Sequence, residues 1–135
     1  MISEAGCVWN FQGVPWCMTF IFAVFIQTYG YEETVKILGR PWPGTRTVAR
    51  RMRRHGRWRE PDYIPSPGDL IFLAPDGRIS HAGIVEAVRG GQVISIDGNT
   101  VDPYGRIPAE RGGAVARRER PIGDPWIVGY SDMRR

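Results

Sequence analysis

The most continuous apolar pattern in the chain runs from Cys17 to Tyr29 and predicts a buried helix. Apolar side chains occupy nearly every side of this stretch, which is typical of a helix enclosed by other elements. Gly30 follows and is expected to end the helix, because glycine readily adopts the left-handed conformation of a C-terminal cap. The apolar run is shorter than the roughly 20 residues that a membrane span needs, so we expect a core helix and no membrane partner.

A second, shorter helix is predicted after a rigid Pro-Trp-Pro-Gly loop at 41–44. Thr45 or Thr47 is expected to cap it, and Gly56 is expected to stop it after about His55. Its apolar positions form a narrow stripe between arginines, which predicts a helix on the surface.

The second half of the chain changes to the pattern of short strands. Three strands with tight turns between them are predicted over 69–74, 79–88 and 93–97, with candidate fourth and fifth strands over 112–118 and 126–130. Helices first and consecutive strands afterwards indicate an α+β fold, with N-terminal helices packed on an antiparallel sheet of about five or six strands. A chain of 135 residues, without a repeat or linker, is expected to be a single domain over 1–135.

Composition excludes several other classes. Two cysteines cannot build a disulfide scaffold, and with two histidines they offer no convincing four-ligand zinc set. The first ten residues lack the basic start and apolar stretch of a signal peptide, which leaves the compartment open.

The net charge of +4 comes almost wholly from arginine, and seven arginines crowd the segment from Arg46 to Arg59. One interpretation is a patch for polyanions, either nucleic acid or the anionic polymers of a bacterial wall. The other is a solvated helix face without a partner. The sequence leaves both open.

The candidate chemistry lies in three separate segments. Cys17 stands at the start of the first helix, where the helix dipole favours a thiolate. His81 lies in the second strand and Asp97 at the end of the third, so that a cysteine, a histidine and an orienting side chain follow in the order of a cysteine hydrolase. Side chains alternate along a strand, so His81 and Gly83 share one face, as do Asp97 and Asn99. Gly83 is expected to leave room for a large neighbour such as the helix of Cys17.

These residues carry a resemblance to a known family. The chain resembles the CHAP family, the cysteine- and histidine-dependent amidohydrolases/peptidases among the papain-like cell-wall hydrolases of bacteria and phages. The matching motifs are Trp16-Cys17-Met18-Thr19-Phe20, Pro67-Gly68-Asp69-Leu70-Ile71-Phe72, His81-Ala82-Gly83-Ile84-Val85 and Ile96-Asp97-Gly98-Asn99-Thr100.

The resemblance implies a papain-like fold, with Cys17 as nucleophile and His81 as general base. The third member is usually Glu in the family; here Asp97 or Asn99 would orient the imidazole. Gln12 as an oxyanion donor, and Trp16 and Trp42 as groove residues, are candidates for substrate binding.

The implied substrate is peptidoglycan, cut either between N-acetylmuramic acid and L-alanine or at a peptide bond of the stem or cross-bridge. No metal or other cofactor is implied. We expect a monomer acting at the bacterial cell wall as an endolysin-like or autolysin-like enzyme, with anionic wall polymers, and not nucleic acid, as partners of the Arg46–Arg59 segment. The alternatives are a catalytically silent wall-binding module and, less favoured, an arginine-rich nucleic-acid binder.

Overall fold

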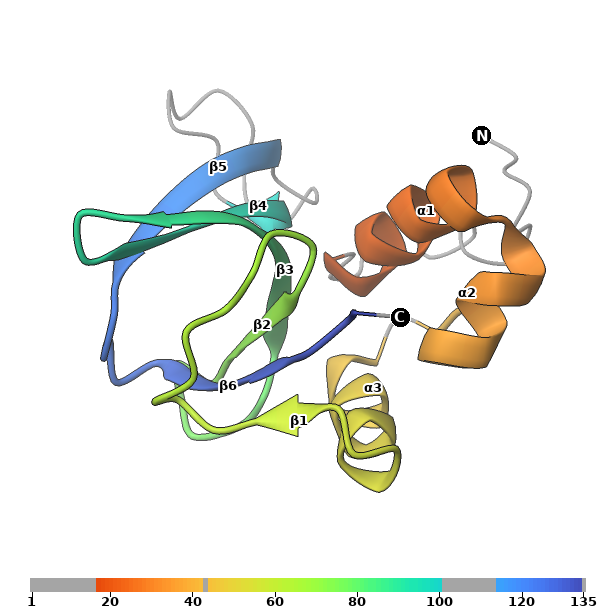
Figure 1. Ribbon diagram of the computed structural model, residues 1–135, viewed down its shortest axis with the longest axis horizontal. Helices are drawn as coiled ribbons and strands as arrows, with labels where there is room; N and C mark the ends of the chain where they lie inside the picture. Colours follow the sequence, from red (N-terminus) through yellow and green to blue (C-terminus); the bar gives the residue numbers. More distant parts are fainter. Residues whose placement is uncertain (1–16, 43, 101–113, 135) are drawn as a thin grey trace.

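A computed structural model describes residues 17–42, 44–100 and 114–134, with the backbone alone at 99, 100 and 114. Within these ranges the chain forms three helices followed by six strands (Figure 1). The helices are α1 (Cys17–Tyr29), α2 (Tyr31–Leu38) and α3 (Thr45–Arg54). The strands are β1 (Trp58–Arg59), β2 (Leu70–Leu73), β3 (His81–Arg89), β4 (Gln92–Thr100), β5 (Ala114–Pro121) and β6 (Ile127–Ser131).

The strands form one antiparallel sheet in the order β1-β6-β2-β3-β4-β5. Strands β2, β3 and β4 are the three predicted consecutive strands and pair in that order as a meander, which β5 extends, and β6 returns to pair with the other side of β2. The helices are gathered on one side of this curved sheet (Figure 1). The predicted α+β architecture is therefore confirmed.

Helix α1 has the bounds that the apolar pattern predicts. Gly30 ends it with a φ of 87°, and its N–H donates to the carbonyl of Ile26 at 2.8 Å. Helix α2 was not predicted. It has only eight residues, begins directly after Gly30, and buries just Thr34, Ile37 and Leu38, so its apolar pattern is short.

Helix α3 corrects one expectation. Its N-cap is Gly44, with no capping hydrogen bond from a side chain, so neither Thr45 nor Thr47 caps it. Thr45 is instead the first helical residue, and it is buried. The helix ends at Arg54, and Gly56 follows with a φ of 72°, close to the predicted stop.

Two hydrophobic clusters fill the two faces of the sheet. The larger one joins the three helices to Leu70, Phe72 and Ala82. The smaller one contains Ile71 and Leu73, which alternate with the first pair along β2. All of β2 is buried for this reason. No helix among the described residues is long and apolar enough to cross a membrane.

The arginines of the 46–59 segment divide into two groups. Some are tied into the fold: Arg51 donates to carbonyls at the end of α2, Arg53 stacks on Trp58 at 4.3 Å, and Arg57 and Arg59 hold the C-terminal segment. The others are exposed, have no ion pair among the described residues, and follow one another every four residues along α3: Arg46, Arg50 and Arg54.

We predict that Arg51→Met lowers the free energy of unfolding by about 1–2 kcal/mol, because the guanidinium donates to the carbonyls of Val35, Lys36 and Ile37 at the C-terminal end of α2. Its exposed neighbour provides the control: Arg50→Met should change stability by less than about 0.5 kcal/mol. Urea denaturation of both variants measures the difference. Equal stability of the two would show that Arg51 does not join α2 to α3.

Candidate active site

The three residues predicted to act together converge where α1 meets the sheet. Cys17 is the first residue of α1, His81 the first of β3, and Asp97 lies in β4. The Nε2 of His81 donates to Oδ2 of Asp97 at 2.8 Å. Because Nε2 is used in this way, Nδ1 is the nitrogen left to face the thiol, and a hydrogen bond joins the imidazole to Cys17.

Asp97 is fully buried and is held by three groups besides the backbone. Ser95, two residues earlier on the same face of β4, donates to Oδ1 at 2.6 Å. Arg120 of β5 donates to Oδ2 at 2.9 Å, so that oxygen accepts from both Arg120 and His81. This environment offsets the cost of burying a charge. Burial favours the neutral acid, but the hydrogen bond from His81 and the charge of Arg120 hold the pKa of Asp97 below its usual value.

Gly83 makes this arrangement possible, and for a different reason from the one expected. A Cβ at this position would overlap with Oδ1 of Asp97, and would lie 2.9 Å from its Cγ. The missing side chain therefore leaves room for the carboxylate on the neighbouring strand, and not for the helix that carries Cys17.

The sulfur of Cys17 lies at the junction of both layers. It is 3.5 Å from Oγ1 of Thr45, the first residue of α3, and it accepts a hydrogen bond from the backbone of Ala82 in β3. Burial opposes ionisation of this thiol, since Cys17 is only 1 % exposed. The hydrogen bond and charge of His81, aided by Thr45 and Ala82, outweigh burial and lower the pKa of Cys17 from its ordinary 9.0.

The pKa of the His81 imidazole is shifted upward, whereas that of the Cys17 thiol is shifted downward. Burial disfavours its charged form, but the hydrogen bonds and charges of Asp97 and Cys17 raise the pKa of His81 from 6.5 to about 9. The lowered pKa of the thiol and the raised pKa of the imidazole together favour a thiolate–imidazolium pair near neutral pH.

The other predicted site residues have different outcomes. Trp16 and Gln12 lie outside the described residues, and so does the side chain of Asn99. Of the two candidates for orienting His81, Asp97 is thus the one seen in contact with it. Trp42 is 54 % exposed and lies in the loop between α2 and α3, three positions before Thr45.

Three residues that contact the site were not predicted from the sequence. Ser95 could have been found, because period-two alternation puts it on the face of Asp97. Arg120 could not, since its approach depends on the register between β4 and β5. Thr45 is predicted only as one of two possible helix caps, and its sequence context does not indicate the contact with the thiol.

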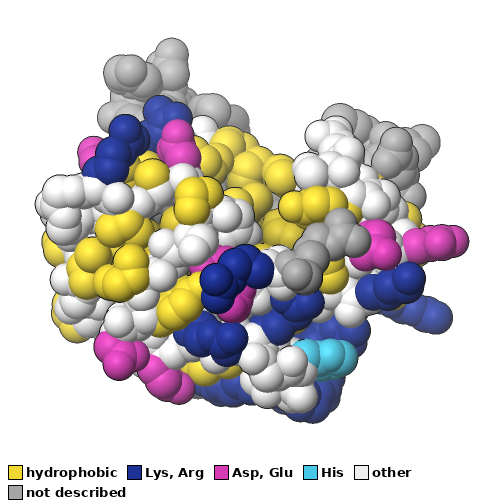
Figure 2. Space-filling view, viewed as in Figure 1, with side chains coloured by type: hydrophobic (Ala, Val, Ile, Leu, Met, Phe, Trp, Pro, Cys, Tyr) yellow, Lys and Arg dark blue, Asp and Glu magenta, His cyan; other side chains and the backbone are white. Residues whose placement is uncertain are grey.

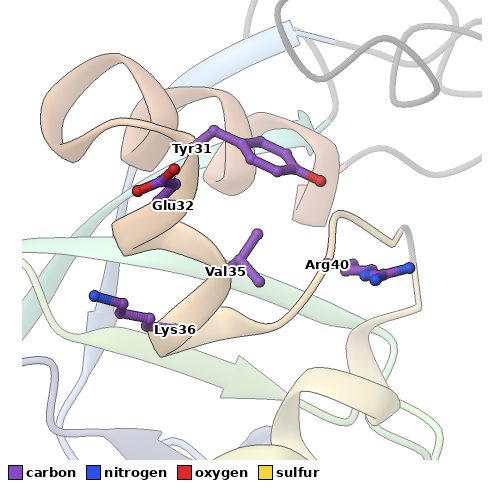
Figure 3. A pocket seen from close by; sticks show the side chains of 5 residues that line it. All are labelled: Tyr31, Glu32, Val35, Lys36 and Arg40. Carbon is purple, nitrogen blue, oxygen red and sulfur yellow. The ribbon is translucent and has the colours of Figure 1, made fainter.

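Other potential sites are less well formed. No group of three acidic, histidine or cysteine side chains in the described parts of the chain is placed to hold a metal ion. An open pocket lies along α2 and the loop after it, and side chains of both charges line it (Figure 3). Its lining residues are Tyr31, Glu32, Val35, Lys36 and Arg40, none of which takes part in the hydrogen bonds around Cys17, His81 and Asp97.

The fold and this geometry define the class of protein: a papain-like α+β domain with a cysteine and a histidine side by side. The CHAP domain family matches the chain over residues 9–99, more than half of its length, and the chain belongs to that family. CHAP domains are generally hydrolases, and membership indicates a function of the peptidoglycan-hydrolase type. Comparison with curated proteins gave no match, and comparison with solved structures gave none either.

We predict that the Cys17 thiol titrates with a midpoint below 9.0, and that His81→Ala moves the midpoint above it, because burial is then no longer opposed by the imidazole. The ultraviolet absorbance of the thiolate measures this in a Cys7→Ser background, with Cys7→Ser/Cys17→Ser as the blank. A midpoint at or above 9.0 with His81 present would contradict the ion pair.

Proposed function

We propose that this protein is a cysteine amidohydrolase or peptidase that cleaves an amide bond of peptidoglycan. The observation that carries the proposal is the contact of His81 with both Cys17 and a buried, ionised Asp97. Family membership supports the substrate class. The bond is either the amide between N-acetylmuramic acid and L-alanine or a peptide bond of the stem or cross-bridge.

In the proposed mechanism the Cys17 thiolate attacks the amide carbonyl while His81 holds the proton. The carbonyl oxygen becomes an oxyanion, and the backbone N–H of Cys17, which has no partner within α1 because it lies in the first turn, is suited to donate to it. His81 then gives its proton to the leaving amine, which departs as the thioester forms. Water, deprotonated by His81, hydrolyses the thioester and releases the acid, which restores Cys17.

Asp97 has a supporting role in this scheme. By accepting from Nε2 it fixes the ring with Nδ1 toward the sulfur, and it stabilises the imidazolium. Trp42 remains a candidate for packing against substrate, because it is exposed on the loop that leads to Thr45 and so to the sulfur.

We expect Cys17→Ala to reduce the release of soluble fragments from purified peptidoglycan by on the order of 10³-fold or more, since the step needs the thiolate. Mass spectrometry of the fragments made by the unaltered protein identifies the bond that is cut. Cys7→Ser is the matched control and should retain activity. If Cys17→Ala kept a tenth of the activity, its role as nucleophile would be wrong.

One observation favours a second candidate, a module that binds the wall without turnover. Cys17 is 1 % exposed, and a nucleophile must be reached by a polymer. The same assay separates the candidates: a binding module sediments with peptidoglycan and releases no fragments, whether or not it carries Cys17→Ala.

We further propose that the exposed arginines of α3 attract the anionic polymers of the wall. Figure 2 shows dark blue side chains gathered at the lower right, over α3. Arg46, Arg50 and Arg54 point away from the buried side of this helix and lack ion pairs among the described residues. Three exposed cations in one row produce a local positive field suited to a polyanion.

Replacing Arg46, Arg50 and Arg54 with Gln should lower activity on intact walls at low salt, and should flatten its decline with salt, because these charges are screened beyond about 8 Å at physiological ionic strength. Activity on a small soluble muropeptide should stay unchanged. The control variant loses the same charge elsewhere on the surface: Arg40, Arg78 and Arg89→Gln. Equal effects of the two triple variants would refute a specific role for α3, and tighter retention on DNA than on walls would favour a nucleic acid as partner.

A further inference from the structure

We propose that Arg120 is a positioning residue of the active site, whose guanidinium holds Asp97 against His81 and sets the pH range in which the Cys17–His81 pair is charged. The proposal deepens the proposed function and rests on it for turnover. Titration of the thiol tests it independently of any substrate.

The first support is a closed set of hydrogen bonds. Nη2 of Arg120 donates to Oδ2 of Asp97 at 2.9 Å, and Nη1 donates to Oγ of Ser95 at 3.0 Å. Ser95 in turn donates to the other carboxylate oxygen, Oδ1, at 2.6 Å. The planar guanidinium thus contacts Asp97 directly and through Ser95, and it fixes where the carboxylate lies.

The ion pair between Arg120 and Asp97 is buried, which strengthens it. The Asp97 side chain is 0 % exposed and that of Arg120 only 15 %, so water screens this pair little. By contrast Arg117, on the same strand, is 60 % exposed and pairs with Glu86 on the surface. Arg120 therefore belongs to the interior of the site, whereas Arg117 belongs to the solvated side of β5.

The charged groups around Asp97 come from three elements other than its own strand. Cys17 of α1 and His81 of β3 lie on one side, Arg120 of β5 lies on the other, and Arg118 stands opposite Ser95 in the register of β4 with β5. A guanidinium group is charged throughout the pH range in which proteins work. The guanidinium of Arg120 therefore compensates the buried carboxylate even when His81 is neutral, and Asp97 remains ionised through the whole catalytic cycle.

Removal of Arg120 is expected to raise the pH at which the Cys17–His81 ion pair forms. Without Arg120 the site carries one positive charge less, so the thiolate becomes harder to form and the imidazolium easier to keep. A loosened Asp97 also orients His81 less well, which weakens the support that His81 gives to the thiolate. Both consequences move formation of the ion pair to higher pH.

The test compares Arg120→Met, Arg120→Lys and the matched control Arg117→Met, all in the Cys7→Ser background. Thiolate absorbance should show the Cys17 midpoint raised by on the order of one pH unit in Arg120→Met. It should return toward the unaltered value in Arg120→Lys, which restores the charge, and stay unchanged in Arg117→Met. On a small muropeptide, kcat should fall at least about tenfold in Arg120→Met with little change in KM.

An unchanged midpoint in a folded Arg120→Met protein would overturn the proposal and leave Arg120 a purely structural residue. If Arg120→Met does not fold, the thiol midpoint and kcat of Arg120→Lys and Ser95→Ala test the proposal instead. A normal midpoint with lowered kcat in these two variants supports a positioning role, and a normal midpoint with normal kcat refutes it. If the midpoints shift as expected while even the unaltered protein releases no fragments, the proposed function fails and the role of Arg120 at the thiol stands.

Discussion

The buried carboxylate of Asp97 is the constraint on which the site depends. A charge that is fully removed from water is stable only when other groups compensate it, and here the compensating groups come from His81 on β3 and Arg120 on β5, with Ser95 beside it on β4. The pairing of these three strands is therefore required by charge as well as by backbone hydrogen bonds. A slip in register would turn Asp97 to the other face and leave the imidazole without its partner.

The sulfur imposes a second requirement, because it joins the sheet to the helical layer. Cys17 begins α1, Thr45 begins α3, and Ala82 lies in β3, so three elements must meet at one atom. The large hydrophobic cluster between the helices and β2 fixes this meeting point. Two helix N-termini near the sulfur add positive potential in a region that burial would otherwise make unfavourable for a thiolate. The stability of the core and the ionisation of Cys17 are thus linked.

Much of the fold and the Cys17–His81–Asp97 set could be predicted from the sequence, and the elements and residues that were not predicted have physical causes. The bounds of α1 followed from a continuous apolar run ended by Gly30, and the meander followed from short apolar runs separated by turn residues. Helix α2 was not predicted because it buries only three side chains, which give too short an apolar pattern. The two-residue β1 is too short for any pattern to show, and the approach of Arg120 to Asp97 depends on a register that is fixed only when the sheet forms.

The short acid at position 97 also becomes understandable. The family usually has Glu at the corresponding position, and although Asp is one methylene shorter, Oδ2 of Asp97 still lies 2.8 Å from Nε2 of His81. Gly83 permits this, because any Cβ there would overlap with the carboxylate. The glycine and the shorter acid therefore fit together, because the carboxylate takes the space that a side chain at position 83 would fill. The carboxylate of Asp97 occupies the space beside Gly83 and reaches both His81 and Arg120 from there, so the aspartate, the glycine and the arginine depend on one another.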